Sequence, residues 1–133
     1  MFQRLFIVIS NLYNLYNMNE EEDQAKKMAS IQKLRALKDG WLDGTGKAPS
    51  SEILEHLTQL LIKCPMLPGI VPTPSGGAEF FWHKQGITVA IEPDLSTTIM
   101  APSNEDPTEP TTAFFTKEQI SDCTYHLQTI LPH

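Results

Sequence analysis

Glu79 and His83 are of the types that carry general acid and base catalysis. They lie two positions on either side of Phe81 in a run of alternating residues. An imidazole beside a carboxylate can move protons, but side chains four positions apart on a strand are separated by roughly 13 Å along the backbone. The pattern therefore favours a solvated polar face and assigns no catalytic residue. A small enzyme that uses Glu79 with His83, or Asp43, is the alternative.

Four side chains are nominal zinc ligands. Cys123 and His126 lie one helical turn apart, and His56 and Cys64 lie on an earlier helical segment. Their spacing matches no compact zinc motif, and both cysteines occupy apolar positions. We therefore expect buried free thiols of the kind found in a reducing cytoplasm, with neither a disulfide, a metal nor a cofactor.

The glycine-rich stretch DGWLDGTGKAP, residues 39–49, resembles a phosphate-binding loop at its end. Five residues rather than four separate Gly40 from Gly46, an alanine replaces the magnesium-binding Ser or Thr, and the stretch follows a predicted helix instead of a strand. Its aspartates do not reproduce the alternating ligands of a calcium loop. A turn between two helices is favoured, with Trp41 and Leu42 anchoring it in the core.

The periodicity of apolar residues predicts the elements that hold these side chains. Helical spacing runs over about 20–38 and again over 50–64, and Thr116 with Gln119 forms a capping box at the start of a third helix. Between them the period is two, which predicts strands over 78–83, 87–92 and 96–101, and a short edge strand over 70–73. The fold class is therefore α+β: two helices, an antiparallel meander of three or four strands, then a C-terminal helix, with the helices packed on one face of the sheet.

The turn between the two central strands restricts their register. Phe80 and Trp82 share a face with the apolar residues of the next strand if the turn is Gln85-Gly86 or the four residues 83–86. Either turn places Phe81 on the opposite face, together with Glu79, His83, Thr88 and Glu92. A large aromatic residue there is covered by the N-terminal segment or by the loop after residue 101, or else it belongs to a partner-binding patch.

Residues 101–115, APSNEDPTEPTTAFF, are rich in proline and acidic residues. We interpret them as a loop, either a linker or a recognition loop, because long loops in compact domains tend to be functional or mobile. The predicted partner-binding residues of the chain are Glu79, Phe81, His83, Thr88, Glu92, Glu105, Asp106 and Glu109.

The composition limits the classes of partner. The chain has 133 residues and a net charge of -6, which argues against direct binding of nucleic acid, because that affinity comes from clustered Lys and Arg. An acidic surface fits solubility or a basic protein partner. The apolar run near the N-terminus is too short for a membrane span, so we expect a cytoplasmic protein that does not enter a membrane.

The first residues, MFQRLFIVISNLYNLYN, precede Met18 and an acidic run. We interpret 1–17 as an N-terminal extension, with Met18 an alternative start, and 18–133 as one α+β domain. A structural subunit that forms homo-oligomers through residues 2–16 is a further alternative.

Two motifs in this order resemble those of a group of small uncharacterised bacterial proteins. The motifs are LKDGWLDGTGKAPS and PTPSGGAEFFWHKQGITVAIE, within about residues 34–92. The resemblance implies a D-G-x-G loop and a P-T-P-x-G-G segment before a Trp-bearing strand, but no activity. It also implies a bacterial or phage origin, in accessory genes of mobile or defence-related regions. The matching positions are Asp43, Gly44, Gly46, Pro72, Pro74, Gly76, Gly77 and Trp82.

Negative charge without a catalytic constellation favours a non-enzymatic protein-interaction module. An inhibitor of the antitoxin, immunity or phage-inhibitor kind fits this description, with a protein as its partner.

Overall fold

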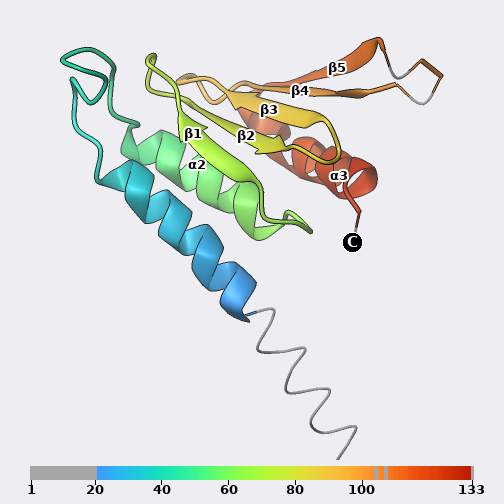
Figure 1. Cartoon of the computed structure of the whole chain (residues 1–133), viewed down its shortest axis with the longest axis horizontal. Coiled ribbons are helices and arrows are strands. Elements are labelled where there is room, and N and C mark those ends of the chain that lie inside the picture. Colours follow the sequence, from blue (N-terminus) through green and yellow to red (C-terminus); the bar gives the residue numbers. More distant parts are fainter. Residues whose placement is uncertain (1–20, 104, 107, 133) are drawn as a thin grey trace, which may run out of the picture.

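The sheet is an antiparallel meander whose five strands lie side by side in chain order. The computed structural model describes residues 21–103, 105–106 and 108–132 (Figure 1). A helix over residues 21–35 and α2 (Ser51–Ile62) precede the sheet. The strands are β1 (Gly69–Pro72), β2 (Ala78–Trp82), β3 (Ile87–Ile91), β4 (Thr97–Pro102) and β5 (Pro110–Phe115). A short 3-10 turn, η1 (Lys117–Gln119), then leads into α3 (Ile120–Ile130).

The α+β class is confirmed, with five strands in place of the three or four expected, and the shared face of the two central strands is confirmed too. Trp82 pairs with Ile87 and Phe80 with Val89, so the turn is the four-residue one, residues 83–86. One face of β2, β3 and β4 is buried at every second position, as the alternating sequence requires. The short strand β1 lies at the edge of the sheet, where its proline is tolerated.

The interpretation of 101–115 as a loop is wrong, because six of these residues form the fifth strand. β5 pairs with β4 without interruption, from Thr97 opposite Phe115 to Pro102 opposite Pro110. Threonine and phenylalanine favour strands, and Pro110 stands at the first position of an edge strand, where a missing N–H is tolerated. The prolines and acidic residues that precede β5 are typical of a loop, so the sequence pattern did not indicate this short strand.

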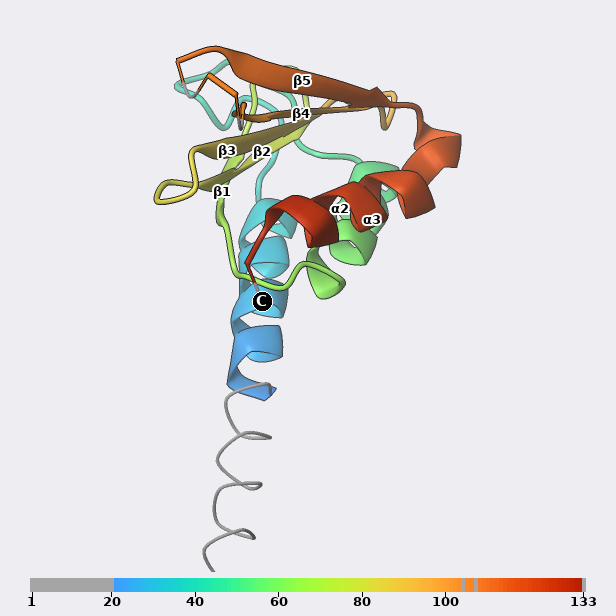
Figure 2. The ribbon, with the colours of Figure 1, turned by 90° about the vertical axis from the view of Figure 1, so that its right-hand side faces the viewer.

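The helices lie on one side of the sheet (Figure 2). They bury Leu57, Phe80, Val89 and Leu127 in a single core. Both helices next to the sheet are capped at their starts. Ser50 Oγ accepts a hydrogen bond from Ile53 N at 3.2 Å before α2, and the predicted capping box of Thr116 and Gln119 is present before α3.

The helix over 21–35 carries a lysine into the core. Lys27 is 2% exposed, and its Nζ donates a hydrogen bond to the carbonyl oxygen of Cys64 at 2.8 Å. Asp23 Oδ2, one turn earlier, lies 3.2 Å from the same Nζ. The lysine thus places a cation against a carbonyl just beyond the C-terminal end of α2, where helix carbonyls lack partners within the helix.

The two glycine-rich motifs meet at one corner of the fold. Leu42 and Thr45 pair across a two-residue turn at Asp43 and Gly44, which both have positive φ. Lys47 N donates to Pro74 O at 2.9 Å, which joins this loop to the turn between β1 and β2. The motifs therefore have a structural role.

The expected anchoring of this loop is only partly right. Trp41 is half-buried, and its Nε1 donates to Lys47 O at 2.9 Å. Leu42 is exposed, because its strand-like pairing with Thr45 holds it in a small hairpin outside the core.

Candidate functional site

The sheet has a second face, on the side away from the core, which we call the outward face. Strand pairing arranges it in two rows. One row is Gly69, Phe81, Thr88, Met100 and Thr112; the other is Val71, Glu79, Ala90, Thr98 and Phe114. Glu79 is the one charged residue in these two rows. Val71, Met100 and Phe114 are exposed, Phe114 by 63%.

Four predicted binding residues gather in one hollow of this face. The hollow has a volume of about 410 Å³. It is lined by Val71, Glu79, Phe81, Trp82, His83, Gly86, Ile87 and Thr88. Apolar walls around one carboxylate are suited to an apolar group that carries a positive charge.

Phe81 is held by its own sheet. Gly69 lies opposite it on β1, and a Cβ built on Gly69 would stand 2.2 Å from the Cζ atom of the ring. The ring therefore lies flat over the glycine, a packing known to protect glycine in edge strands. The ring also forms a T-shaped contact with His83, with ring centroids 5.3 Å apart. Phe81 is half-buried by these contacts and still lines the hollow.

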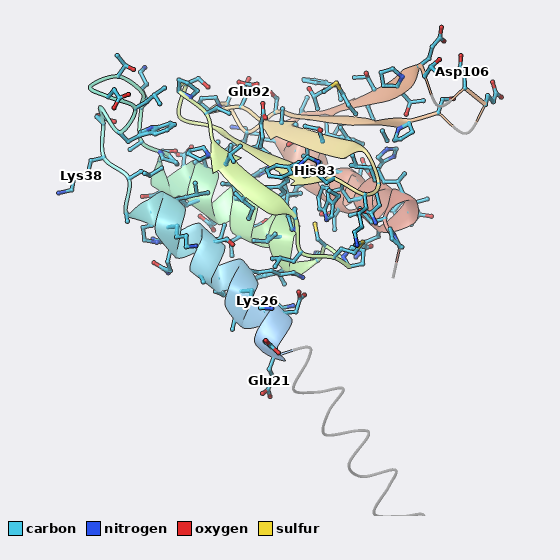
Figure 3. All side chains as sticks on the ribbon, in the orientation of Figure 1. Glu21, Lys26, Lys38, His83, Glu92 and Asp106 are labelled. Carbon is cyan, nitrogen blue, oxygen red and sulfur yellow. The ribbon has the colours of Figure 1, made fainter. Side chains whose placement is uncertain are left out.

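The other predicted binding residues lie elsewhere. Figure 3 shows Asp106 on the hairpin that projects beyond the sheet, and Glu92 well away from His83. Glu105 and Glu109 flank Asp106 on the exposed connection between β4 and β5. Hydrogen bonds from the Thr108 side chain, at 2.6 Å, and from its backbone N–H, at 3.0 Å, lower the pKa of Asp106. These carboxylates therefore form a separate acidic hairpin, while Glu92 stands just beyond the C-terminal end of β3.

Glu79 and His83 line the same hollow without contacting each other. Phe81 stands between them, and no hydrogen bond or ion pair joins the two side chains in the described part of the chain. Asp43 occupies an exposed turn at the glycine-rich corner. The three candidates for acid and base chemistry are therefore not assembled into one proton-transfer pair.

The nominal zinc ligands do not form a metal site among the described residues. Cys64 and Cys123 are buried and free; burial raises the pKa of Cys64 to about 11 and that of Cys123 to about 12. Burial also lowers the pKa of His56, and His126 lies beside Phe115, with ring centroids 5.7 Å apart. Within residues 21–103, 105–106 and 108–132, no three metal-binding side chains come together.

A second hollow, of about 520 Å³, lies between α3 and the ends of β4 and β5. Two of the hydroxyl groups that line it are engaged: Thr111 donates to Ala101 O at 3.2 Å, and Thr129 donates to Tyr125 O at 2.9 Å. Because these two hydroxyl groups already donate to backbone carbonyls, they are not free to donate to a ligand. The outward face is therefore the better candidate for recognition.

Sequence reasoning missed three exposed apolar residues of the outward face: Val71, Met100 and Phe114. Each belongs to an edge strand or to a strand next to an edge. Met100 lies two positions after Thr98 in the predicted third strand, so the alternation could have placed both side chains on the same face of the sheet. Phe114 required recognition of β5.

Comparisons with protein families, with curated proteins and with solved structures found no match. None of the described helices is long and apolar enough to cross a bilayer. The predicted extension at 1–17 and the alternative start at Met18 lie outside the described residues.

Proposed function

We propose that this protein is a non-enzymatic interaction module that binds another protein through its outward face. The observation that carries the proposal is the composition of that face. Its two rows combine exposed valine, methionine and phenylalanine with threonines and one carboxylate. Exposed apolar side chains gathered on one face mark interaction sites in soluble proteins.

Glu79 indicates the chemistry of the partner. The residue is half-buried, and its carboxylate has no ion-pair partner among the described residues. A partner that covers the hollow removes water from this carboxylate, and burying it unpaired is costly. A lysine or arginine within an apolar surface of the partner compensates that cost. The net charge of -6 adds a long-range attraction to such a basic partner.

Proteins of the antitoxin, immunity or phage-inhibitor kind fit this mode of action, because they act by covering a surface of their target. In this proposal the projecting acidic hairpin lies outside the central contact.

Two lysine substitutions test the outward face. Val71→Lys and Met100→Lys place a cation at exposed positions, 41% and 42% exposed, where a basic partner docks. Tagged protein from the native host is expected to retain its partner as wild type and to lose it in both variants. The matched controls are Ile62→Lys and Tyr125→Lys, at exposed apolar positions on α2 and α3.

Glu79→Gln adds a test of charge. It is expected to weaken binding about tenfold or more, since a charge-assisted contact is lost from a desolvated site. The proposal fails if the wild-type chain captures no partner, or if the control variants lose it as readily as the outward-face variants do.

A further inference from the structure

The backbone of the free edge of β5 is a second interaction surface, distinct from the outward face, to which β5 contributes the side chains of Thr112 and Phe114. β5 is the last strand of the sheet, and within the described part of the chain it has a strand neighbour on one side only. In Figure 2 it forms the outer margin of the sheet, with α3 on the core side. One line of backbone N–H and C=O groups along six residues is therefore available for pairing.

The two edges of the sheet differ in their protection. β1 has four residues and ends in Pro72, with Pro68 before it and Pro74 after it. Prolines and short length discourage pairing of an edge strand. β5 has six residues, carries no charged side chain, and has its single proline at the first position. Its uninterrupted register with β4 leaves it without a bulge.

We propose that β5 pairs with β5 of a second copy of this chain, antiparallel and across a twofold axis, so that two five-stranded sheets join into one continuous sheet. The axis passes beside Ala113. This register keeps the outward faces of both copies on the same side, because opposed residues in an antiparallel pair share a face. It provides about four to six backbone hydrogen bonds between the copies.

The side chains of β5 complement themselves in this register. Phe114 of each copy lies opposite Thr112 of the other, and Phe115 lies opposite Thr111. Cross-strand pairs of an aromatic with a β-branched residue are favourable. The small side chain of Ala113 meets its own copy at the axis, where a larger residue would crowd the pair.

The charged residues at the two ends of β5 favour this register and favour a second copy of the chain as the partner. Residue numbers of opposed pairs sum to 226. This register brings Glu109, the residue before β5, near Lys117 of the other chain, which begins η1 two residues after β5, once at each end of the joint. Both residues are exposed, and neither has an ion-pair partner among the described residues of its own chain. A shift of the register by two residues would bring Glu109 opposite Phe115 and lose both ion pairs.

Charge reversal tests the proposal by sedimentation equilibrium of the full chain over a range of concentrations. Glu109→Lys and Lys117→Glu each replace two attractions by two repulsions. Since exposed ion pairs contribute little individually, each single variant is expected to dimerise about tenfold more weakly than wild type. An equimolar mixture of the two variants regains both attractions and is expected to associate about as tightly as wild type.

The controls use exposed charges away from the joint. Lys63→Glu and Glu52→Lys, near the two ends of α2, are expected to leave the dimer unchanged. A wild-type chain that stays monomeric up to about 0.5 mM overturns the proposal. Dimerisation that neither Glu109→Lys nor Lys117→Glu weakens also overturns it, since another surface then forms the dimer. A mixture that associates no more tightly than the single variants overturns the register.

This inference is independent of the proposed function. Val71 and Met100, which test the outward face, do not lie on β5. Loss of the partner without loss of the dimer, or the reverse, therefore tells the two surfaces apart.

Discussion

Lys27 offers a direct test of how a buried cation contributes to this fold. Its side chain is 2% exposed, whereas that of Asp23, its ion-pair partner, is 38% exposed. The ammonium group therefore meets one buried acceptor, the Cys64 carbonyl at 2.8 Å, and one partly hydrated carboxylate. Removing the lysine leaves Asp23 to water but leaves the carbonyl without this donor.

The expected cost has two parts. Lys27→Ala removes about three buried methylene groups, or about 2.4 kcal/mol, and leaves a buried carbonyl unsatisfied, at about 1–3 kcal/mol. Lys27→Met keeps most of the apolar stem and loses only the second part. The free energy of unfolding is therefore expected to fall by about 3–5 kcal/mol in Lys27→Ala and by about 1–3 kcal/mol in Lys27→Met.

Urea unfolding, followed by the fluorescence of Trp41 and Trp82 at one fixed protein concentration, measures both values. The control is Lys26→Ala, the neighbouring lysine, whose side chain is 61% exposed and whose pair with Glu22 spans 3.6 Å. It is expected to change stability by less than about 0.5 kcal/mol. A Lys27→Met variant at least as stable as wild type would refute the contribution of the ammonium to the carbonyl. A Lys27→Ala variant that is as stable as the Lys26→Ala control would refute the conclusion that the Lys27 side chain is buried.

Two further predictions concern close packing and buried thiols. Gly77→Ala is expected to lower the free energy of unfolding by at least about 2 kcal/mol, because the added Cβ would stand 2.2 Å from the Ile91 carbonyl oxygen. The control is Gly44→Ala, whose Cβ meets open space at a φ of 91°. In the same urea assay it is expected to lower the free energy of unfolding by only about 1 kcal/mol. Burial raises the pKa of Cys64 from 9.0 to about 11. Between these two pH values the folded protein keeps the thiol proton and the unfolded chain loses it. The free energy of unfolding is therefore at its full value below pH 9 and falls as the pH rises towards 11. This thiol contributes a slope of about 1.4 kcal/mol per pH unit to the fall of the unfolding free energy with pH. A Cys64→Ala variant whose unfolding free energy falls as steeply as that of wild type over this range would contradict the prediction.

The α+β class, the shared face of the two central strands and the capping box before α3 could be predicted from the sequence, which left two turns between those strands open. They depend on local patterns: period-two alternation on both sides of a short turn, and capping residues at helix starts. Phe81 could be assigned to the face opposite Phe80 and Trp82 for the same reason, since a strand turns successive side chains to opposite sides.

Only the tertiary structure decided which residues share the outward face with Phe81. Val71 and Phe114 lie on strands at opposite edges of the sheet and join one row through the pairing of all five strands. The identity of β5 depended on this pairing too, because a short run that begins at a proline forms a strand only through its hydrogen bonds to β4. Burial of Lys27 likewise required the end of α2 to supply a carbonyl 37 residues away. Local periodicity determines which side a residue faces, while long-range packing determines its neighbours.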